Sequence, residues 1–298
     1  MRTSRDSNNI SFSILMATYN NANYIETAIK SVINQTYLNW ELIIVNDAST
    51  DNSIKIIEPF LEDKRIQLII LSKNQGVGYA KKVAADNANN DIIGILDADD
   101  KLHEMALEVM LKEYQNNPDY GCIYSTMWRC DSMLKNCKVD KLIGVIEPEK
   151  TCIFNYKVSH FKTYRKEDYF KTLGYDPNLR AAVDRDIIYK LEEVTNFKYI
   201  DKPLYYYRQH QKGVSQGINE YNALYHYYIA KCKAYLRRLD KNLPNLKKED
   251  IILEYYKLKL YKIISFLKPY SRSIEKIIIY LPIKFRFLKG FLKFLKSV

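Results

Sequence analysis

Short apolar runs that stop abruptly at polar clusters dominate the first hundred residues. The strand-like runs are ISFSILMA (10–17), WELIIV (40–45), RIQLIIL (65–71) and DIIGIL (91–96). Between them, residues 25–33, 51–61 and 77–87 place apolar side chains at helical spacing. Strands that are apolar on both faces and alternate with helices form a parallel sheet. The pattern therefore predicts an α/β fold.

Glycine is scarce, and this argues against several nucleotide-binding classes. The chain has 9 glycines in 298 residues, well below the roughly 7% of an average protein. No G-x-x-x-x-G-K-[ST] phosphate loop occurs, and the pattern Gly76-Val77-Gly78 has Lys81 where a dinucleotide-binding loop needs a third glycine. An ATPase or a dinucleotide-dependent dehydrogenase is therefore disfavoured. Because 47% of the residues are apolar and 27% charged, we expect a folded globular protein.

The cysteines do not form a recognisable framework. They are Cys122, Cys130, Cys137, Cys152 and Cys232. Their number is odd and no C-x-x-C pair occurs, which argues against a secreted disulfide scaffold and against a four-cysteine zinc site. We therefore expect reduced thiols, as in cytosolic proteins.

The beginning of the chain carries no pattern of a secretory signal. Residues 1–9, MRTSRDSNN, are polar and lead directly into a short apolar stretch, without the longer apolar core of a signal peptide. No apolar run approaches the roughly 18 residues of a transmembrane helix. We expect a cytoplasmic protein that makes any membrane contact at the surface.

Polar residues gather where the predicted strands end, which is where open α/β sheets bind ligands. They are Thr18, Asn20, Asp47, Asn74, Asp97, Asp99 and Asp100. Any one of them could simply cap a helix or fill a turn. The run Asp97-Ala98-Asp99-Asp100 is different, because three carboxylates so close together repel unless a cation or a proton neutralises them. Oxygen ligands of this kind suit Mg²⁺ or Mn²⁺.

Several blocks in order carry a resemblance to a known family. SILMATYNNANYIETAIKSVINQTYLNWELIIVNDASTDNS, followed by NQGVGYAKK and GILDADD, resembles the nucleotide-sugar-binding half of the inverting glycosyltransferases of family 2, which have the GT-A fold. The likeness is close over residues 11–100 and looser to about 215. It implies a GT-A domain over 1–218, with a donor half at about 10–100 and an acceptor half at about 101–218. A basic, Tyr-rich helical region would follow at 219–298.

The resemblance also implies a donor site that depends on a divalent metal. In it the Thr18-Tyr19 turn and Asp47 line the pocket for the base and ribose, Asp97 meets the ribose and Asp99 binds the metal on the diphosphate. The remaining donor-binding residues by resemblance are Asn20, Glu26, Asn74 and Lys81. Lys81 replaces the usual arginine, which keeps a positive charge but loses the planar fork. Lys82 and Ala48 also depart from the family pattern.

A second block resembles the segment that holds the family's catalytic base. In GYDPNLRAAVDRD the matching residue is Asp184, with Val183 where the family has glutamate. A carboxylate there can remove the proton of an acceptor hydroxyl as it attacks, and a single displacement inverts the anomeric centre. The alternative is that Asp184 and Asp186 only cap a helix over 187–194.

A third block, KPLYYYRQH at 202–210 with Ser215, resembles the family's later motif. It implies that Arg208 holds the leaving diphosphate and that His210 completes the metal shell or bonds the phosphate. His160 and Arg165 match a strand that we expect to shape the acceptor site.

The last eighty residues change composition. Tyr221, Tyr225, Tyr228, Cys232 and Tyr235 recur at helical spacing and predict a packing face. Residues 249–298 contain eleven basic and four acidic side chains, most of the chain's net charge of +11. In 282–298, Phe and Leu side chains fall opposite Arg286, Lys289, Lys293 and Lys296, as in helices that bind anionic membrane surfaces. Docking on the catalytic domain is the alternative.

The leading interpretation is a metal-dependent inverting glycosyltransferase using a nucleoside-diphosphate sugar, most simply a UDP-sugar. Its acceptor would be a glycan or lipid-linked glycan assembled at the inner face of the membrane. Transfer to polyprenyl phosphate and an inactive GT-A binding module are the alternatives. A nucleotidyltransferase is disfavoured because its Gly-rich loop is missing, and nucleic-acid binding because no helix-turn-helix, zinc-finger or aromatic RNA motif occurs.

Overall fold

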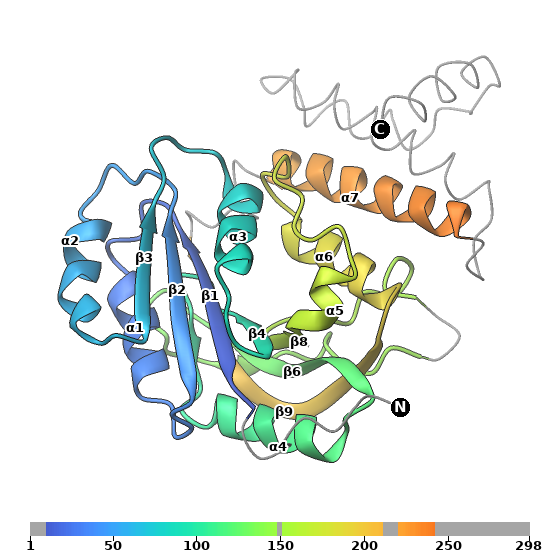
Figure 1. The fold of residues 1–298 in the computed structure, drawn as a ribbon, viewed down its shortest axis with the longest axis horizontal. Helices are drawn as coiled ribbons and strands as arrows, with labels where there is room; N and C mark the ends of the chain where they lie inside the picture. Colours follow the sequence, from blue (N-terminus) through green and yellow to red (C-terminus); the bar gives the residue numbers. More distant parts are fainter. Residues whose placement is uncertain (1–9, 148–150, 211–219, 242–298) are drawn as a thin grey trace.

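One large mixed sheet organises the protein. The computed structural model describes residues 10–147, 151–210 and 220–241. Within these residues the strands follow the order β3-β2-β1-β4-β8-β6-β9-β5, and β7 pairs with β6 beside this path (Figure 1). Helices flank the sheet, as the predicted α/β fold requires.

The first half of the sheet is parallel, as predicted from the apolar runs. Its strands are β1 (Phe12–Thr18), β2 (Trp40–Asn46), β3 (Ile66–Ile70) and β4 (Ile92–Ile95), and its helices are α1 (Ile25–Ile33), α2 (Ser53–Ile57) and α3 (Val77–Asp86). The helix expected over 51–61 is divided, because α2 is followed by the 3₁₀ helix η1 (Glu58–Glu62). Pro59 lies at the start of η1, and a proline has no N–H with which to continue an α-helix.

The second half adds antiparallel neighbours. It contains β5 (Lys101–Leu102), α4 (Ala106–Asn116), β6 (Tyr120–Cys130), β7 (Lys138–Val139), β8 (Lys162–Arg165), α5 (Lys166–Phe170), α6 (Val183–Glu192) and β9 (Asn196–Arg208). The strand β8 lies between β4 and β6 and runs antiparallel to both, while β6 and β9 are parallel. The insertion of β8 joins the predicted donor and acceptor halves into a single sheet.

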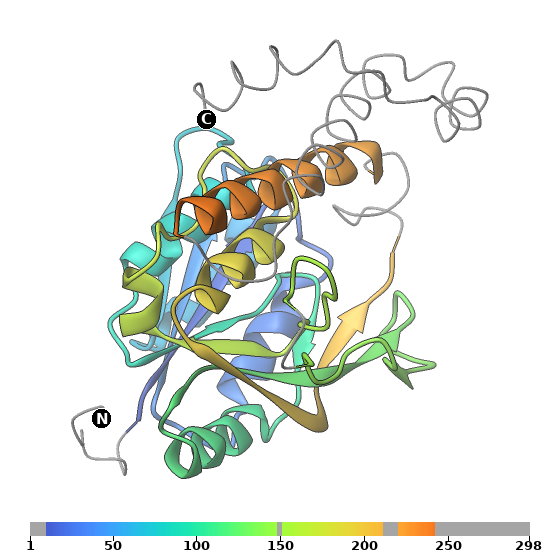
Figure 2. The same ribbon diagram turned by 90° about the vertical axis from the view of Figure 1, so that its right-hand side faces the viewer.

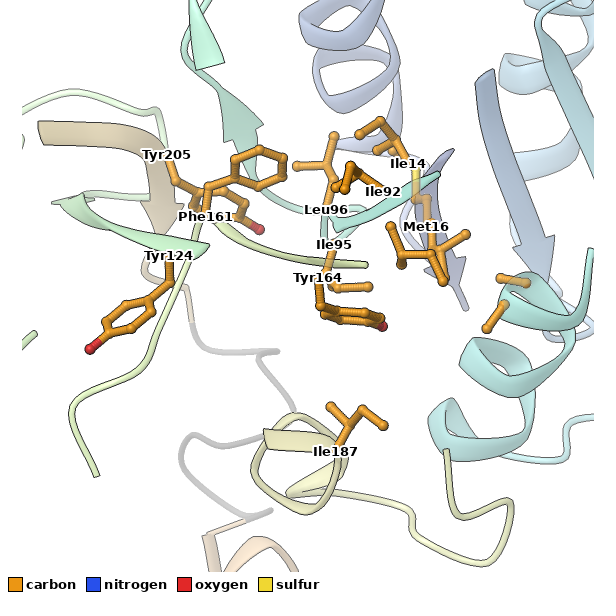
Figure 3. Close-up of a cluster of buried hydrophobic side chains, with 14 of the residues drawn as sticks. Ile14, Met16, Ile92, Ile95, Leu96, Tyr124, Phe161, Tyr164, Ile187 and Tyr205 are labelled. Carbon is orange, nitrogen blue, oxygen red and sulfur yellow. The ribbon is translucent and has the colours of Figure 1, made fainter. Parts of the chain in front are cut away.

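The two halves also share one hydrophobic core. Ile14 of β1 and Ile92 of β4 belong to the same buried cluster as Phe161, next to β8, and Tyr205 of β9 (Figure 3). Large tyrosines fill much of the second half, and several of their hydroxyls are paired: the Tyr164 and Tyr175 hydroxyls lie 2.7 Å apart. Buried tyrosines are expected to be hydrogen-bonded in this way.

The helix α7 (Glu220–Asp240) lies along α6 (Figures 1 and 2). Arg237 and Arg238 of α7 pair with Glu193 and Glu192 at the end of α6. Of the predicted packing stripe, Cys232 and Tyr235 are buried. The predicted amphipathic helix over 282–298 lies outside the described residues, within which no helix is long and apolar enough to span a membrane.

The expectation that all cysteines are reduced is wrong for one pair. Cys130 and Cys137 form a disulfide, while Cys122, Cys152 and Cys232 are free and buried. The turn between β6 and β7 brings the pair together, because the Asp131 carboxylate accepts backbone N–H groups of Met133 and Lys135 and so folds the turn tightly. A spacing rule based on C-x-x-C pairs does not detect a disulfide that depends on a hairpin.

Candidate active site

A cleft of about 1050 Å³ opens where β1, β2 and β4 end. Its volume is at the upper end of the range for small-molecule sites. Twelve of the residues singled out by sequence line it: Thr18, Tyr19, Asn20, Asp47, Lys81, Asp97, Asp99, Asp100, His160, Asp184, Arg208 and His210. The sheet topology explains this, because the carboxyl ends of parallel strands meet at one edge.

The wall after β1 and β2 is rigidly hydrogen-bonded. Asn20 has a positive φ of 55°, and its side-chain oxygen accepts the backbone N–H of Thr50 at 2.8 Å. The two carboxylate oxygens of Asp47 accept the backbone N–H groups of Gln75 and Gly76, each at 2.7 Å. Asp47 therefore fixes the loop that leads into α3, in addition to lining the cleft.

A buried lysine links two carboxylates at the centre of the cleft. The ammonium of Lys81, on α3, lies 3.0 Å from Asp97 and 2.8 Å from Asp184. Burial alone would raise the pKa of Asp97, but the Lys81 charge holds it below its ordinary value. The same carboxylates raise the pKa of Lys81 against the opposing effect of burial. Lys81 is therefore a cation with two anionic partners.

Two more residues complete this cluster: Lys162, the first residue of β8, and His160, two residues before it. The Lys162 ammonium donates to the second oxygen of Asp184 at 2.9 Å and lies 3.3 Å from Nδ1 of His160. Burial opposes ionisation of Asp184, but Lys162 and Lys81 hold its pKa well below the ordinary value. Burial, followed by the Lys162 charge, lowers the pKa of His160 to about 4. His160 is therefore neutral at pH 7, and its ring stacks on that of Tyr205.

A second group lies around Asp99. Its carboxylate is 2.8 Å from Nε2 of His210, and its backbone carbonyl accepts the Nε–H of Arg208 at 2.6 Å. Arg208 also donates to the carbonyl of Ser132 and rests over the ring of Tyr24. Asp99 therefore contacts both Arg208 and His210, the residues predicted to bind the diphosphate and the metal.

The environment of the Asp100 carboxyl differs from those of Asp97 and Asp99. Its carboxyl is buried and accepts hydrogen bonds from the Tyr205 hydroxyl and the backbone N–H of Arg208, both at 2.7 Å. Burial, and then the charges of Asp99 and Asp97, raise its pKa well above the ordinary value. Asp97 is paired with Lys81 and the Asp100 carboxyl is biased towards its protonated form, so two of the three carboxylates are relieved of repulsion in different ways, while Asp99 lies against His210.

A family model described as glycosyl transferase family 2 matches residues 13–192, more than half of the chain. This chain belongs to glycosyltransferase family 2. Chondroitin synthase of Pasteurella multocida (strain Pm70) is 32% identical over 199 residues, which are 65% of this chain and 20% of that protein. The match thus spans about a fifth of that synthase. The Escherichia coli UDP-Glc:alpha-D-GlcNAc-diphosphoundecaprenol beta-1,3-glucosyltransferase is 32% identical over 189 residues, 57% of this chain and 72% of that protein.

Solved structures confirm the GT-A fold of this family 2 glycosyltransferase. The Staphylococcus aureus TarS fragment 1–349 in complex with UDP-GlcNAc has a TM-score of 0.65 at 20% identity, covering 89% of this chain and 74% of that one. A mannosyltransferase of Pyrobaculum calidifontis, in complex with GDP-Man and Mn²⁺, has a TM-score of 0.55 at 14% identity, covering 90% and 78%. The fold expected from the sequence is therefore confirmed.

Two sets of side chains in this glycosyltransferase could hold a divalent ion. Ligand atoms of Asp97, His160 and Asp184 lie within 4.8 Å of one another. However, the ammonium groups of Lys81 and Lys162 already pair with the carboxylates of this set, and an ion there would have to displace both of them.

The Asp99–His210 pair fits a metal better. No lysine contacts the Asp99 carboxylate among the described ion pairs, and its 2.8 Å separation from His210 is close to the roughly 3 Å between adjacent ligands of an octahedral Mg²⁺ or Mn²⁺. Nδ1 of His210 is buried without a hydrogen-bond partner in the described part of the chain. We infer that this pair is the better candidate ligand set.

The structure places three residues that were expected at the site away from the cleft. Glu26 forms an exposed pair with Lys30 along α1, Asn74 bonds Arg180, and Arg165 bonds the carbonyls of Tyr120 and Pro118. None of the three lines the cleft.

Lys162, Arg185 and Tyr227 also line the cleft, although no sequence motif points to them. A lysine inside the strand-like HFKTY was the one available signal for Lys162, because a buried lysine needs a carboxylate partner.

Proposed function

We propose that this glycosyltransferase moves a sugar from a UDP-sugar to an acceptor hydroxyl with inversion, using a divalent metal ion. The observation that carries the proposal is that Asp97 and Asp99, in the loop after β4, and Asp184, in the first turn of α6, line one cleft of a family 2 fold. Solved neighbours in complex with UDP and UDP-GlcNAc support a uridine donor. The similarity to a glucosyltransferase whose name gives a diphosphoundecaprenol acceptor supports a lipid-linked glycan as the acceptor. The proposal places its assembly at the inner face of a membrane.

In this proposal the donor lies along the strand ends. Its base and ribose occupy the wall formed by Thr18, Tyr19, Asp47 and Asp97. Its diphosphate lies at Asp99, His210 and Arg208. The Nε and Nη1 atoms of Arg208 bond backbone carbonyls, and among the described residues Nη2 has no partner, so it is available to a phosphate oxygen. A divalent ion on Asp99 and His210 would neutralise charge on the departing diphosphate.

Asp184 acts as the base in this scheme. Lys81 donates to one of its oxygens and Lys162 to the other, and each oxygen keeps a further lone pair that can accept the acceptor's proton. The side chain is 26% exposed, so an acceptor can reach it. As the acceptor oxygen bonds to C1 of the sugar, the C1–diphosphate bond breaks and the proton moves to Asp184. The two lysines keep the carboxylate ionised and oriented before that step.

A screen of nucleotide sugars tests this function. Release of nucleoside diphosphate is measured with each donor and a panel of glycan and lipid-linked acceptors, and the anomeric configuration of the product is read by NMR. We expect turnover with a UDP-sugar and an inverted product. Binding of donors without turnover of any of them would overturn the proposal and leave a GT-A binding module.

The two lysines beside Asp184 also favour one alternative, transfer to polyprenyl phosphate. A phosphate acceptor is already an anion and needs no base, and ammonium groups suit it. In that case Asp184→Asn would retain activity with polyprenyl phosphate.

A further inference from the structure

An arginine lies directly after the proposed base and is enclosed by two tyrosines. The guanidinium carbon of Arg185 is 4.3 Å from the ring centroid of Tyr156 and 4.8 Å from that of Tyr227. The three residues come from the segment before β8, the first turn of α6 and α7, and all line the cleft. Figure 2 shows α6 and α7 side by side. Segments far apart in the sequence thus converge on one cationic group.

Unlike Lys190, Arg237 and Arg238, Arg185 pairs with no acidic side chain of the described residues. Lys190 pairs with Asp186, Arg237 with Glu193 and Arg238 with Glu192. Elsewhere in the cleft, Arg129 pairs with Asp140, and Lys81 and Lys162 pair with Asp184. Within residues 10–147, 151–210 and 220–241, Arg185 forms no ion pair, although it is partly buried. Among the described residues its charge is offset by tyrosine side chains, by the rings of Tyr156 and Tyr227 and by Tyr189 beside them.

A guanidinium in this position is suited to bind an anion. Withdrawing a cation from water is unfavourable unless a counter-charge or hydrogen bonds replace the water. The tyrosine rings stabilise the cation and restrict its plane, and they leave its N–H edges free of carboxylates. Arginine recognises carboxylate and phosphate oxygens with two parallel hydrogen bonds, which a lysine cannot do.

We propose that Arg185, held between Tyr156 and Tyr227, binds an oxyanion carried by the acceptor and so selects acceptors with a carboxylate or a phosphate. The proposal rests on the proposed function, because it assigns the acceptor to the part of the cleft that holds Asp184. The donor's diphosphate is assigned to Asp99, His210 and Arg208, which come from other elements. Two anions therefore bind at two distinct cationic positions.

Binding of matched probes to the full-length protein in the presence of UDP tests the proposal. One pair is methyl glucuronide and methyl glucoside, which differ by a carboxylate. The other is an alkyl diphosphate of N-acetylglucosamine and the corresponding alkyl glycoside, which differ by the diphosphate. We expect the protein to prefer the charged member of at least one pair by about 10-fold or more, the gain of a charge-assisted bond. The pair that shows the preference identifies the source of the oxyanion.

Substitution of Arg185 gives the decisive comparison. Arg185→Gln should abolish the preference while the affinities for UDP and for the neutral probe stay unchanged, and Arg185→Lys should retain part of it. Arg65→Gln is the matched control, because that guanidinium also lies over a ring, 3.8 Å from the centroid of Trp40, but outside the cleft. Thermal melting confirms that each variant is folded.

The outcomes separate this proposal from the proposed function. Equal affinity for both members of both pairs, or a preference that survives Arg185→Gln, overturns the anion site. Transfer of sugar to charged and neutral acceptors at equal efficiency also overturns it, while leaving the transferase function intact. An Arg185-dependent preference without any turnover supports the site and counts against the function.

Discussion

The buried ammonium of Lys81 lies 2.8 Å from the carboxylate of Asp184 and is also 3.0 Å from that of Asp97. One cation therefore ties the residue assigned to the donor ribose to the residue assigned to catalysis. The side chain of Lys81 is only 5% exposed, whereas its two partners keep about a quarter of their surface in water. Substitutions at these positions should separate charge balance from catalysis.

Lys81→Met should lower stability and shift the pH profile. Without the ammonium, Asp97 and Asp184 repel each other. The free energy of unfolding should therefore fall, but by less than the about 3–5 kcal/mol typical of breaking a fully buried pair. The pKa values of both carboxyls should rise, so the acid limb of kcat/KM should move to higher pH. Lys82→Met is the matched control, because Lys82 is the next residue of α3 and forms an exposed pair with Asp86 on the helix surface. An unchanged profile in Lys81→Met would show that Lys81 does not set the ionisation of Asp184.

The lysine charges beside Asp97 and Asp184 also predict how the stability of the unaltered protein depends on pH. The folded-state pKa values of Asp97 and Asp184 are lowered, so their contribution is fully present above the unfolded value of about 3.9. It is lost as the pH falls through the folded-state values. Denaturant unfolding measured from pH 6 downward should therefore show stability falling below about pH 4, and the fall should be smaller in Lys81→Met.

Asp184→Asn should reduce turnover by roughly 10²- to 10⁴-fold, the usual effect of removing a positioned base. Donor affinity should persist, because the residues assigned to the donor come from other elements. The measurement is kcat with the identified acceptor, together with donor binding by calorimetry. Asp86→Asn, on the exposed face of α3, is the control. A collapse of donor affinity along with turnover would make Asp184 a binding or folding residue.

Metal dependence should follow Asp99 and His210. We expect excess EDTA to abolish transfer, and Asp99→Asn or His210→Gln to weaken Mn²⁺ binding by at least about 10- to 100-fold, the loss seen even for outer-shell partners. His160→Gln should leave Mn²⁺ affinity unchanged, because Lys81 and Lys162 already neutralise the carboxylates beside His160. If instead His160→Gln removes Mn²⁺ binding, the ion occupies the Asp97–His160–Asp184 set. Full activity in EDTA would exclude a metal requirement.

The sequence could predict the parallel half of the sheet and most of the cleft, because both depend on local order. Apolar runs define β1, β2, β3 and β4, and the residue after each strand end must lie at the same sheet edge. The position of β8 between β4 and β6 could not be predicted, because strand neighbours are set by packing between distant segments.

The missed site residues have the same physical origin. Lys162 belongs to the candidate site because β8 brings it to Asp184, and Tyr227 belongs to it because α7 lies along α6. Asp47 was correctly placed in the cleft, but its bonds to Gln75 and Gly76 depend on a loop conformation that no local pattern encodes. Roles that require two remote segments to meet are therefore the ones that sequence patterns leave out.

The end of the chain should bind anionic membranes. Over 282–298 the sequence places Phe285, Leu288 and Leu295 opposite a basic face. The apolar side chains would be removed from water at the interface, and each cation would add about 1 kcal/mol near anionic lipid. We expect sedimentation of the protein with vesicles rich in anionic lipid, weakened by high salt because exposed charges are screened.

Two truncations separate membrane binding from folding. Deleting 282–298 should release the protein from vesicles while turnover on a soluble acceptor analogue stays nearly intact, because every assigned site residue precedes that segment. Deleting 220–298 should instead impair both stability and turnover. It removes Tyr227 from the cleft, and it removes Arg237 and Arg238, the ion-pair partners of Glu193 and Glu192. If the shorter deletion unfolds the protein and the full chain ignores vesicles, the segment is part of the folded core. The membrane assignment would then be abandoned in favour of a docked helix.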